Sequence, residues 1–464
     1  MVPIKSDTFR AYDIRGVVDK DFDPEWVETL GKACGTYFQQ NGHFQAIVSH
    51  DCRHSSPLYQ ARLIQGLVST GIDVTYTPMV STPVFYYAIK SLKRHAGVMI
   101  TASHNPPEYN GFKVWSGDNT IHTTEIQRIY EIMKYQDFIQ GQGVAGEYDI
   151  LPDYLDELSS KTFLSRPLTV VVDGGNGTAG EVCSELLKRI GATVIPIYCK
   201  PDPDFPNHHP DPTVLENIQD LINTVKEREA DFGVGLDGDG DRIGVVNDQG
   251  HILYGDQLLA IFARDILQDQ PGSKIIGEVK CTHLLFKDIK DYGGQPLMWK
   301  TGHSLIKAKM KETQAKLAGE MSGHMFFADR YYGYDDAIYA AKRLAEILGT
   351  DSQKPLSSYL DDWPKTFNTP EIRLQCPDEI KFDLVNQALS YFQNQPYDYE
   401  IIDVDGVRIN FHDGWGLLRA SNTQPVLVLR FEAETQKRLA EIRSFMENPI
   451  NDWIQQQVSD KSQN

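Results

Sequence analysis

Three aspartates, Asp237, Asp239 and Asp241, alternate with glycine in one short stretch of the chain. Such spacing lets a tight loop fold its carboxylate oxygens around one hard divalent cation, and magnesium fits best. A calcium loop of the EF-hand type is excluded, because its sixth and twelfth positions would be Arg242 and Asp248 instead of glycine and glutamate. Without a cation the three carboxylates would repel one another, so the stretch predicts a metal site.

A second reactive group is Ser103, which follows the apolar run 96–100. Short apolar runs are typical of buried parallel strands, and open α/β sheets bind ligands at the carboxyl ends of such strands. A serine hydroxyl needs assistance to react, and His104 and Lys113 are nearby proton handlers. Lys113 could act as a base only if neighbouring cations lower its pKa. The plainer alternative is a helix cap followed by a turn at Asn105 and Pro106.

Groups that suit a sugar occur at 319–324, where Glu320 and Ser322 stand two positions apart. On a strand or extended loop their side chains would share one side and could bind neighbouring sugar hydroxyls. His303 and His324 lack partners at zinc spacing, so no zinc site is assigned.

Groups that suit a phosphate occur near both ends of the chain. Arg10, Tyr12 and Arg15 precede Gly16. The planar guanidinium of arginine suits phosphate, although two arginines near a terminus are more often plain surface residues. In the stretch 419–425 a guanidinium is combined with two hydroxyls and an amide, an inventory typical of phosphate binding. Its members are Arg419, Ser421, Asn422 and Thr423. A plain Ser- and Asn-rich turn is the alternative.

The stretch 175–180 has the form GxGxxG after a predicted strand. A nicotinamide site also needs an acidic residue at the end of the next strand, but the strand at 192–198 continues into Cys199 and Lys200. The motif is therefore interpreted as a structural glycine turn.

Strand-like and helical segments alternate along most of the chain. Strands at 45–48, 73–76 and 98–100 alternate with helices at 58–68 and 83–92, which predicts an α/β sheet with parallel strands. Shorter strands at 399–404, 407–411 and 426–431, followed by a helix from Thr435, predict a final α+β unit. We place domain boundaries so that the four units span 1–149, 150–251, 252–365 and 366–464.

Composition limits the classes of protein. The 464 residues are 41% hydrophobic and 23% charged, and no stretch is long enough to span a bilayer. A net charge of −19 argues against nucleic-acid binding. The first seven residues lack the apolar core of a secretory signal, and six scattered cysteines without CxxC spacing favour a reducing cytoplasm.

Taken in order, the stretches at 101–106, 237–242, 319–324 and 419–423 resemble the α-D-phosphohexomutase family. Gly-Glu-Met-Ser-Gly-His at 319–324 is most similar to its bacterial phosphomannomutase/phosphoglucomutase branch. The resemblance implies a heart-shaped α/β protein in which three similar α/β domains with mixed or parallel sheets and a TBP-like α+β domain enclose a central cleft.

The resemblance also implies roles for individual residues. Ser103 would be phosphorylated and would bind magnesium together with Asp237, Asp239 and Asp241. Lys113 would accept a proton, and Arg242 and His104 would be the other catalytic residues. The implied substrate-binding positions are Tyr12, Arg15, Lys280, Thr301, Gly302, His303, Glu320, Ser322, His324, Arg419, Ser421, Asn422 and Thr423.

The implied reaction interconverts hexose 1- and 6-phosphates of mannose or glucose through a phosphoserine and a 1,6-bisphosphate. Glucose 1,6-bisphosphate or mannose 1,6-bisphosphate would be the activator. Met321 favours this class over phosphoglucosamine mutases, which usually carry Gln there. That mutase, a magnesium-dependent sugar phosphatase and a non-catalytic sensor stay open as alternatives. The partners would be small hexose phosphates, with no nucleic acid or membrane, and the protein would be a monomer or weak homo-oligomer.

Overall fold

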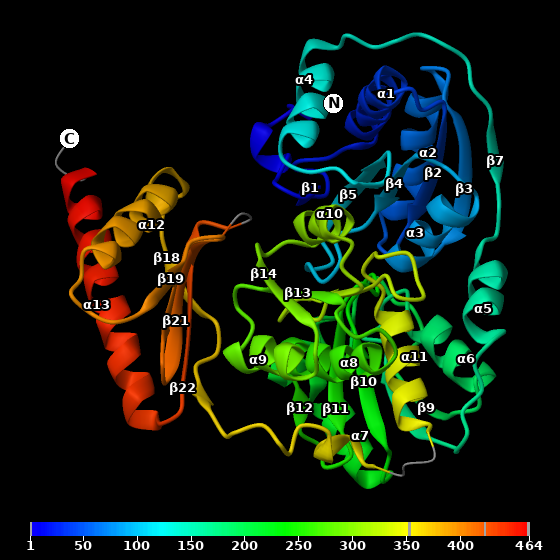
Figure 1. The fold of residues 1–464 in the computed structure, drawn as a ribbon. Coiled ribbons are helices and arrows are strands. Elements are labelled where there is room, and N and C mark those ends of the chain that lie inside the picture. Colours follow the sequence, from blue (N-terminus) through cyan, green and yellow to red (C-terminus); the bar gives the residue numbers. More distant parts are fainter. Residues whose placement is uncertain (1, 351–353, 422–423, 462–464) are drawn as a thin grey trace.

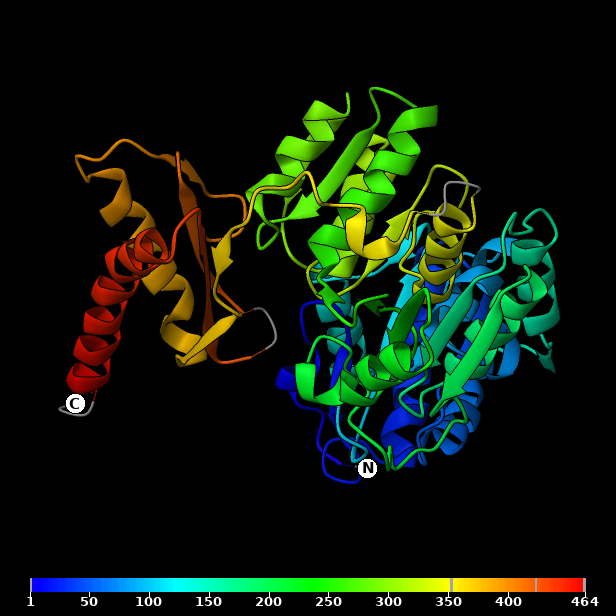
Figure 2. The ribbon, with the colours of Figure 1, turned by 90° about the horizontal axis from the view of Figure 1, so that it is seen from below.

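The computed structural model describes residues 2–350, 354–421 and 424–461. Their chain forms four sheets, one per consecutive part of the sequence. Figure 1 shows the first three parts packed together, with the fourth set to one side and joined to them by an extended segment; Figure 2 shows the same separation from below. The predicted fold class, three α/β units with mixed sheets and a final α+β unit, is confirmed.

The first sheet is organised around β4 (Ala96–Ile100), whose residues are all buried. It pairs in parallel with β2 and antiparallel with β5, so the sheet is mixed. Its order is β1-β5-β4-β2-β3-β7, with β6 paired to β5. The other strands are β1 (Ile14–Val17), β2 (Gln45–His50), β3 (Asp73–Met79), β5 (Tyr109–Ser116), β6 (Asn119–Thr120) and β7 (Ala145–Glu147). The helices are α1 (Pro24–Gln40), α2 (Ser56–Val68), α3 (Thr82–Ser91) and α4 (Thr124–Tyr135).

The second sheet has the order β12-β11-β10-β8-β9. Its central strand β10 is fully buried and forms an antiparallel pair with β11, so the chain between them makes a tight loop at the sheet edge. The strands are β8 (Thr169–Asp173), β9 (Thr193–Ile197), β10 (Phe232–Leu236), β11 (Ile243–Asn247) and β12 (Ile252–Leu253). The helices are α5 (Leu151–Ser159), α6 (Gly180–Arg189) and α7 (Gln219–Glu227).

The third sheet has the order β14-β13-β15-β16 and is parallel except at β16. The strands are β13 (Lys274–Glu278), β14 (Gln295–Trp299), β15 (Leu317–Gly319) and β16 (Met325–Phe327). The helices are α8 (Gly255–Asp269), α9 (His283–Asp291), α10 (His303–Thr313) and α11 (Ala337–Leu348).

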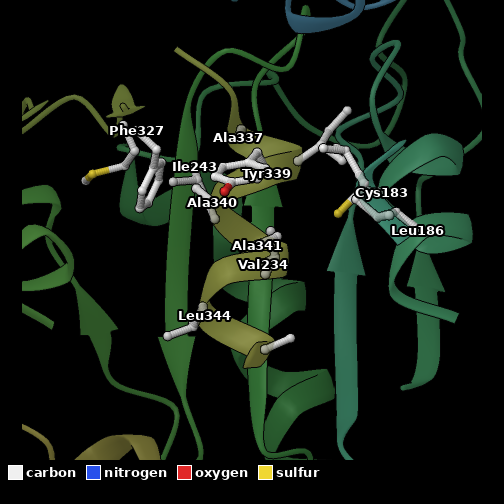
Figure 3. Packing of buried hydrophobic residues seen from close by; sticks show 14 of the residues in the cluster. Cys183, Leu186, Val234, Ile243, Phe327, Ala337, Tyr339, Ala340, Ala341 and Leu344 are labelled. Atoms are coloured by element: carbon white, nitrogen blue, oxygen red, sulfur yellow. The ribbon is translucent and has the colours of Figure 1, made fainter. Parts of the chain in front are cut away.

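Helix α11 belongs to the third part of the sequence but packs against α6 and β11 of the second. Figure 3 shows Ala341 of this helix next to Val234 of β10, with Ala340 and Leu344 on the same helix. Alanines on this face allow the helix to approach the sheet closely, and burying one leucine contributes roughly 1.5–3 kcal/mol. One continuous hydrophobic core therefore links the first three parts of the chain.

The fourth sheet is antiparallel and has a core of its own. Its order is β17-β22-β21-β20-β19, with β18 paired to β22. The strands are β17 (Phe367–Asn368), β18 (Ile372–Gln375), β19 (Glu400–Ile402), β20 (Val407–Phe411), β21 (Gly414–Ala420) and β22 (Val426–Ala433), and the helices are α12 (Asp378–Gln393) and α13 (Gln436–Lys461). Arg408 of β20 ties this sheet to the third by donating to the carbonyls of Val279 and Cys281 at 2.6 and 2.7 Å.

In the described part of the chain, no helix is both long and apolar enough to cross a membrane.

Candidate active site

The acidic loop joins β10 to β11, where the register pairs Leu236 with Ile243. Asp237, Asp239 and Asp241 are at most 1% exposed, and one carboxylate oxygen of each lies within 4.8 Å of the others. Within the described residues, the buried Oδ1 atoms of Asp239 and Asp241 have no hydrogen-bond partner. Because a buried carboxylate oxygen is costly unless it is paired, this convergence of hard oxygen donors fits a divalent cation such as Mg²⁺.

The three carboxylates differ in pKa because their neighbours differ. Burial raises the pKa of Asp237 well above its usual value, and the charges of Asp241 and Asp239 add to this effect. Burial would also raise the pKa of Asp239 and Asp241, but the ammonium of Lys113 helps to lower both. Negative charge is therefore concentrated in one buried loop and only partly balanced by the protein.

Lys113, on β5, supplies that partial balance. Its Nζ donates to Asp239 Oδ2 at 2.7 Å and also to Asp241 Oδ2. Burial alone would lower the pKa of Lys113, but the two carboxylates outweigh burial and raise it. The condition that neighbouring cations lower this pKa is not met by the protein groups alone, because the nearest charges are negative.

Ser103 lies in the turn after β4, with a backbone φ of 50°. Its Oγ donates to Asp237 Oδ2 at 2.6 Å and lies 3.1 Å from His104 Nδ1. The turn is held by Arg53, which is 1% exposed and donates to the carbonyls of Ser103 and Asn105 at 2.9 and 2.5 Å. The hydroxyl is therefore fixed at the edge of the acidic loop.

His104 is positioned beside Ser103 as a neutral imidazole. Burial lowers its pKa well below the usual value, and the nearby charges of Arg242 and Arg15 lower it further. Arg15 itself donates to Asn105 Oδ1 at 2.6 Å, so the N-terminal strand β1 also contacts the serine turn.

Arg242 follows the acidic loop, and its Nε donates to His324 Nε2 at 3.0 Å. An accepting Nε2 requires the proton of neutral His324 to be on Nδ1. That Nδ1 lies 3.1 Å from Asp335 Oδ2, and Asp335 Oδ1 is 3.0 Å from Lys307 Nζ. Asp335 therefore lies within ion-pair distance of His324, without hydrogen-bond geometry between Nδ1 and Oδ2, and these buried polar groups extend to Arg242.

The turn between β15 and β16 contributes Glu320 and Ser322 from the third sheet. Glu320 is 2% exposed, its Oε1 accepts from the Gly302 backbone at 2.7 Å, and burial raises its pKa. Ser322 is half-buried within a turn. The expectation of a strand or extended loop at this pair is wrong, because β15 ends at Gly319 and a tight turn connects it to β16.

Lys280, Thr301 and His303 come from the carboxyl ends of β13 and β14, where parallel strands meet one edge of the sheet. Lys280 Nζ is 3.2 Å from Glu371 Oε2, and this carboxylate helps to raise the lysine's pKa against the effect of burial. Tyr12 OH donates to the Thr301 carbonyl at 3.1 Å and so joins the first sheet to the third.

The fourth sheet contributes Arg419, at 5% exposure, and the buried Ser421. The Arg419 Nε donates to Asp405 Oδ2 at 3.0 Å, and the same oxygen accepts from the Thr301 backbone at 3.0 Å. Asp405 therefore links the predicted phosphate loop to the third sheet. Asn422 and Thr423 lie outside the described residues.

The GxGxxG stretch packs against the acidic loop. A Cβ at Gly177 would lie 2.6 Å from the Gly238 carbonyl oxygen, and Thr178 N donates to the same oxygen at 3.1 Å. The structural interpretation of this motif is supported, because glycine is needed for close backbone approach to the loop.

Four residues that the sequence did not single out also contact the site: Arg53, Thr82, Asp335 and Asp405. Thr82 Oγ1 donates to Asp239 Oδ2 at 2.6 Å. Arg53 could have been found, because it follows the carboxyl end of β2, the same edge that bears Ser103. Asp405 accepts from Thr301 of another part of the sequence, and Asp335 contacts Lys307 and His324 within its own part. No local pattern connects these residues.

Family models match all four parts of the chain. Phosphoglucomutase/phosphomannomutase α/β/α domains I, II and III match residues 6–140, 152–250 and 254–367, and the C-terminal domain matches 371–448.

Individual relatives agree with the family models. A phosphomannomutase/phosphoglucomutase of Pseudomonas aeruginosa is 47% identical over 442 residues, which are 95% of both chains. A phosphoglucomutase of Neisseria gonorrhoeae is 43% identical over 96% of both chains. A solved phosphoglucomutase/phosphomannomutase family protein of Burkholderia thailandensis has a TM-score of 0.91 at 40% identity and covers 98% of both chains.

Fold, acidic loop and serine turn therefore define a protein of the α-D-phosphohexomutase class. The chain belongs to the phosphoglucomutase/phosphomannomutase family.

Proposed function

We propose that this chain is a phosphohexomutase that interconverts the 1- and 6-phosphates of mannose and glucose. The observation that carries the proposal is the position of Ser103, whose Oγ lies 2.6 Å from a carboxylate of the buried acidic loop. A serine turn, a metal-binding loop and a sugar-binding turn on three different sheets provide the groups that phosphoryl transfer to a sugar requires.

In the proposed reaction, the bond between phosphorus and Ser103 Oγ breaks as a bond forms to the free hydroxyl of the sugar phosphate. The 1,6-bisphosphate then turns over and returns its other phosphoryl group to Ser103. Asp237, Asp239, Asp241 and phosphorylated Ser103 would hold Mg²⁺. When bound there, Mg²⁺ would stabilise the charge of the transferring group and offset the carboxylate charges that Lys113 now balances.

The protein's own groups then have separable tasks. Arg242, oriented by His324, would bind oxygens of the transferring phosphoryl group. We propose that Lys113 takes the proton of the attacking hydroxyl. This role requires that bound Mg²⁺ offset the charges of Asp239 and Asp241, which otherwise raise the lysine's pKa. His104 stays neutral because burial lowers its pKa. Since the single proton of Ser103 Oγ is donated to Asp237, His104 would donate its Nδ1–H to Ser103 Oγ.

Sugar recognition would fall to Glu320 and Ser322, with Lys280, Thr301, Gly302 and His303 around them. Contacts to the hydroxyls at carbons 3 and 4 would tolerate either configuration at carbon 2, which is the only difference between glucose and mannose. Arg419 and Ser421, together with Asn422 and Thr423, would bind the phosphate that is not reacting. All six cysteines are unpaired thiols, which supports a reducing, cytoplasmic location.

The test is mass spectrometry after incubation with glucose 1,6-bisphosphate and magnesium. We expect one phosphate on the peptide that contains Ser103 and none on that peptide in Ser103→Ala. Phosphate found only elsewhere would contradict the proposal. A trace of bisphosphate should prime sugar-phosphate isomerisation, whereas a phosphatase would only consume it.

Substrate preference is tested by coupled assays with mannose 1-phosphate, glucose 1-phosphate and glucosamine 1-phosphate. We expect turnover of the first two. Preference for glucosamine 1-phosphate would identify the second candidate, a phosphoglucosamine mutase, against which Met321 argues.

A further inference from the structure

A second pocket, of about 320 Å³, lies between the first and third parts of the chain. Its walls come from the β5–β6 hairpin, from helix α10 and from the segment after β16. Figure 1 shows α10 between the first sheet and the third. None of the residues to which we assign catalysis, metal binding or substrate binding lines this pocket, so it is separate from the active site.

The pocket carries an excess of positive charge although the chain as a whole has a net charge of −19. It contains one carboxylate, Asp118, and four lysines: Lys90, Lys307, Lys311 and Lys316. Lys311 pairs with Asp118. In the part of the chain that the structure describes, no carboxylate pairs with Lys90 or Lys316. Positive charge therefore exceeds negative charge on the walls, as in a site for an anion.

Lys90 lies against the pocket wall through contacts with a ring and a backbone carbonyl. Its Nζ lies 4.8 Å from the centroid of the Trp115 ring and 3.4 Å from the Asp118 carbonyl oxygen. Burial lowers its pKa; Asp118 opposes this effect, and the charges of Lys311 and Lys307 add to it. A bound anion would relieve this repulsion.

One wall is rigid and aromatic. Tyr86 lies behind Trp115 and Tyr334, at centroid distances of 5.4 and 5.3 Å, and all three rings are at most 1% exposed. Lys307 Nζ lies 4.4 Å from the Tyr86 ring centroid. Packing on this scale keeps the pocket open without a ligand to support it.

We propose that this pocket binds a small doubly charged oxyanion, either a phosphate or a dicarboxylate. Its volume is at the lower end for small-molecule sites, and compact ammonium groups suit both kinds of oxygen. One side chain links the pocket to the active site: Lys307 lines the pocket and pairs with Asp335 at 3.0 Å. A bound oxyanion attracts Lys307 away from Asp335 and thereby weakens the support of His324 and Arg242.

Binding is tested by the rate at which each lysine is acetylated, measured by peptide mass spectrometry at constant ionic strength. We expect phosphate at about twice its Kd to slow Lys90 and Lys316 roughly threefold. Lys437, whose side chain is 89% exposed, is the internal control and should not be slowed. Acetylation rates of Lys90 and Lys316 that neither phosphate nor succinate changes would overturn the proposal.

Two further arms identify the site and the ligand. Arg419→Ala removes the phosphate-binding group proposed for the active site, so protection of Lys90 and Lys316 should persist in it; loss of protection would overturn the proposal. Succinate replaces phosphate in the last arm. Protection by both anions identifies the shared oxyanion chemistry, and protection by one identifies the source.

The coupling rests on the proposed mutase function and is tested at saturating sugar phosphate. Phosphate should lower kcat of the wild type and of the control Lys437→Gln, whereas Lys316→Gln should keep its basal kcat and lose this response. An identical response in all three proteins would overturn the coupling. If no mutase activity is found, the proposed function fails, while the acetylation result still decides whether the pocket binds an anion.

Discussion

Ser103 and Asp237 are 134 positions apart, yet the serine Oγ donates a 2.6 Å hydrogen bond to the aspartate Oδ2. The two loops also touch through their backbones, because a Cβ on Gly238 would lie 2.4 Å from the Ser103 carbonyl oxygen. Only glycine permits this approach. The loop that can hold a metal and the turn that bears the nucleophile are thus fitted to each other.

The first prediction concerns the metal. Asp239→Asn removes one anionic ligand from a hard-cation site and one of the carboxylates that bind Lys113, so kcat should fall by about 100-fold or more. Activity measured against Mg²⁺ concentration should also require more metal. Asp383→Asn, an exposed residue of α12, is the matched control and should behave as the wild type. Full activity of the wild type after metal removal would exclude a metal role for this loop.

The second prediction concerns Asp335 as a positioning residue. Asp335→Asn weakens the contact to the His324 Nδ1 proton, so Arg242 loses its fixed acceptor. We expect kcat to fall roughly 10- to 100-fold, by analogy with the partners that orient metal-bound histidines, while KM changes less.

The same change also leaves the buried Lys307 ammonium without its carboxylate, which destabilises the fold. The double variant Asp335→Asn/Lys307→Met separates the two effects. It should regain thermal stability but not kcat. Recovery of kcat together with stability would mean that Asp335 is only a structural residue.

Local sequence patterns predicted the parts of this site that lie within one loop. The alternation of aspartate and glycine at 237–242 and the apolar run before Ser103 each reflect a geometry that is set within a few residues. The contacts of Lys113 with Asp239 and of Tyr12 with Thr301 join different sheets, and no spacing within one segment encodes them. For the same reason the direction of the Lys113 pKa shift could not be read from the sequence, since its charged neighbours are far away in sequence.

The fold class was predictable because strands and helices alternate with clear periods. The packing of α11 on the second sheet was not, because its apolar face would suit any sheet. The turn at Glu320 was missed for a related reason: two polar residues two apart fit both an extended segment and a tight turn.

The third prediction concerns pH and stability. Asp336 caps α11, accepting from Tyr339 N at 2.8 Å and from the Tyr154 hydroxyl, and burial raises its pKa from 3.8 to about 6. The folded state therefore holds the proton more tightly, so this stabilisation is complete below the unfolded pKa and is lost as pH rises through 6. The loss amounts to about 3 kcal/mol.

Asp336→Asn does not titrate at this position. It should be less stable than the wild type at pH near 4, since the amide places an NH2 group where Oδ2 accepts from the Tyr154 and Tyr331 hydroxyls. This difference in the free energy of unfolding should narrow by up to about 3 kcal/mol near pH 7. Urea midpoints of both proteins at the two pH values measure this difference. A difference in the free energy of unfolding that does not change with pH would contradict a raised pKa for Asp336. The control Asp383→Asn should keep the same difference from the wild type at both pH values.

The fourth prediction concerns Arg419, which we propose binds the phosphate that is not reacting. Its guanidinium is held by Asp405, which also accepts from the Thr301 backbone, so the fourth sheet can pass binding energy to the sugar-binding part of the third. A charged hydrogen-bonded contact to phosphate contributes roughly 1.5–3 kcal/mol, or about ten- to hundredfold in binding. Arg419→Ala should therefore raise KM and also lower kcat, because remote binding energy positions the reacting hydroxyl.

Phosphorylation of Ser103 should persist in Arg419→Ala, since neither the serine turn nor the acidic loop contacts Arg419 among the described residues. The variant should release more 1,6-bisphosphate during turnover and need more of it to stay active, and Arg419→Lys should recover part of the loss because it keeps the charge without the planar fork. The test is steady-state kinetics of Arg419→Ala, with the released bisphosphate measured in the same reactions. An unchanged KM together with unchanged bisphosphate release would show that the segment 419–423 is only a turn.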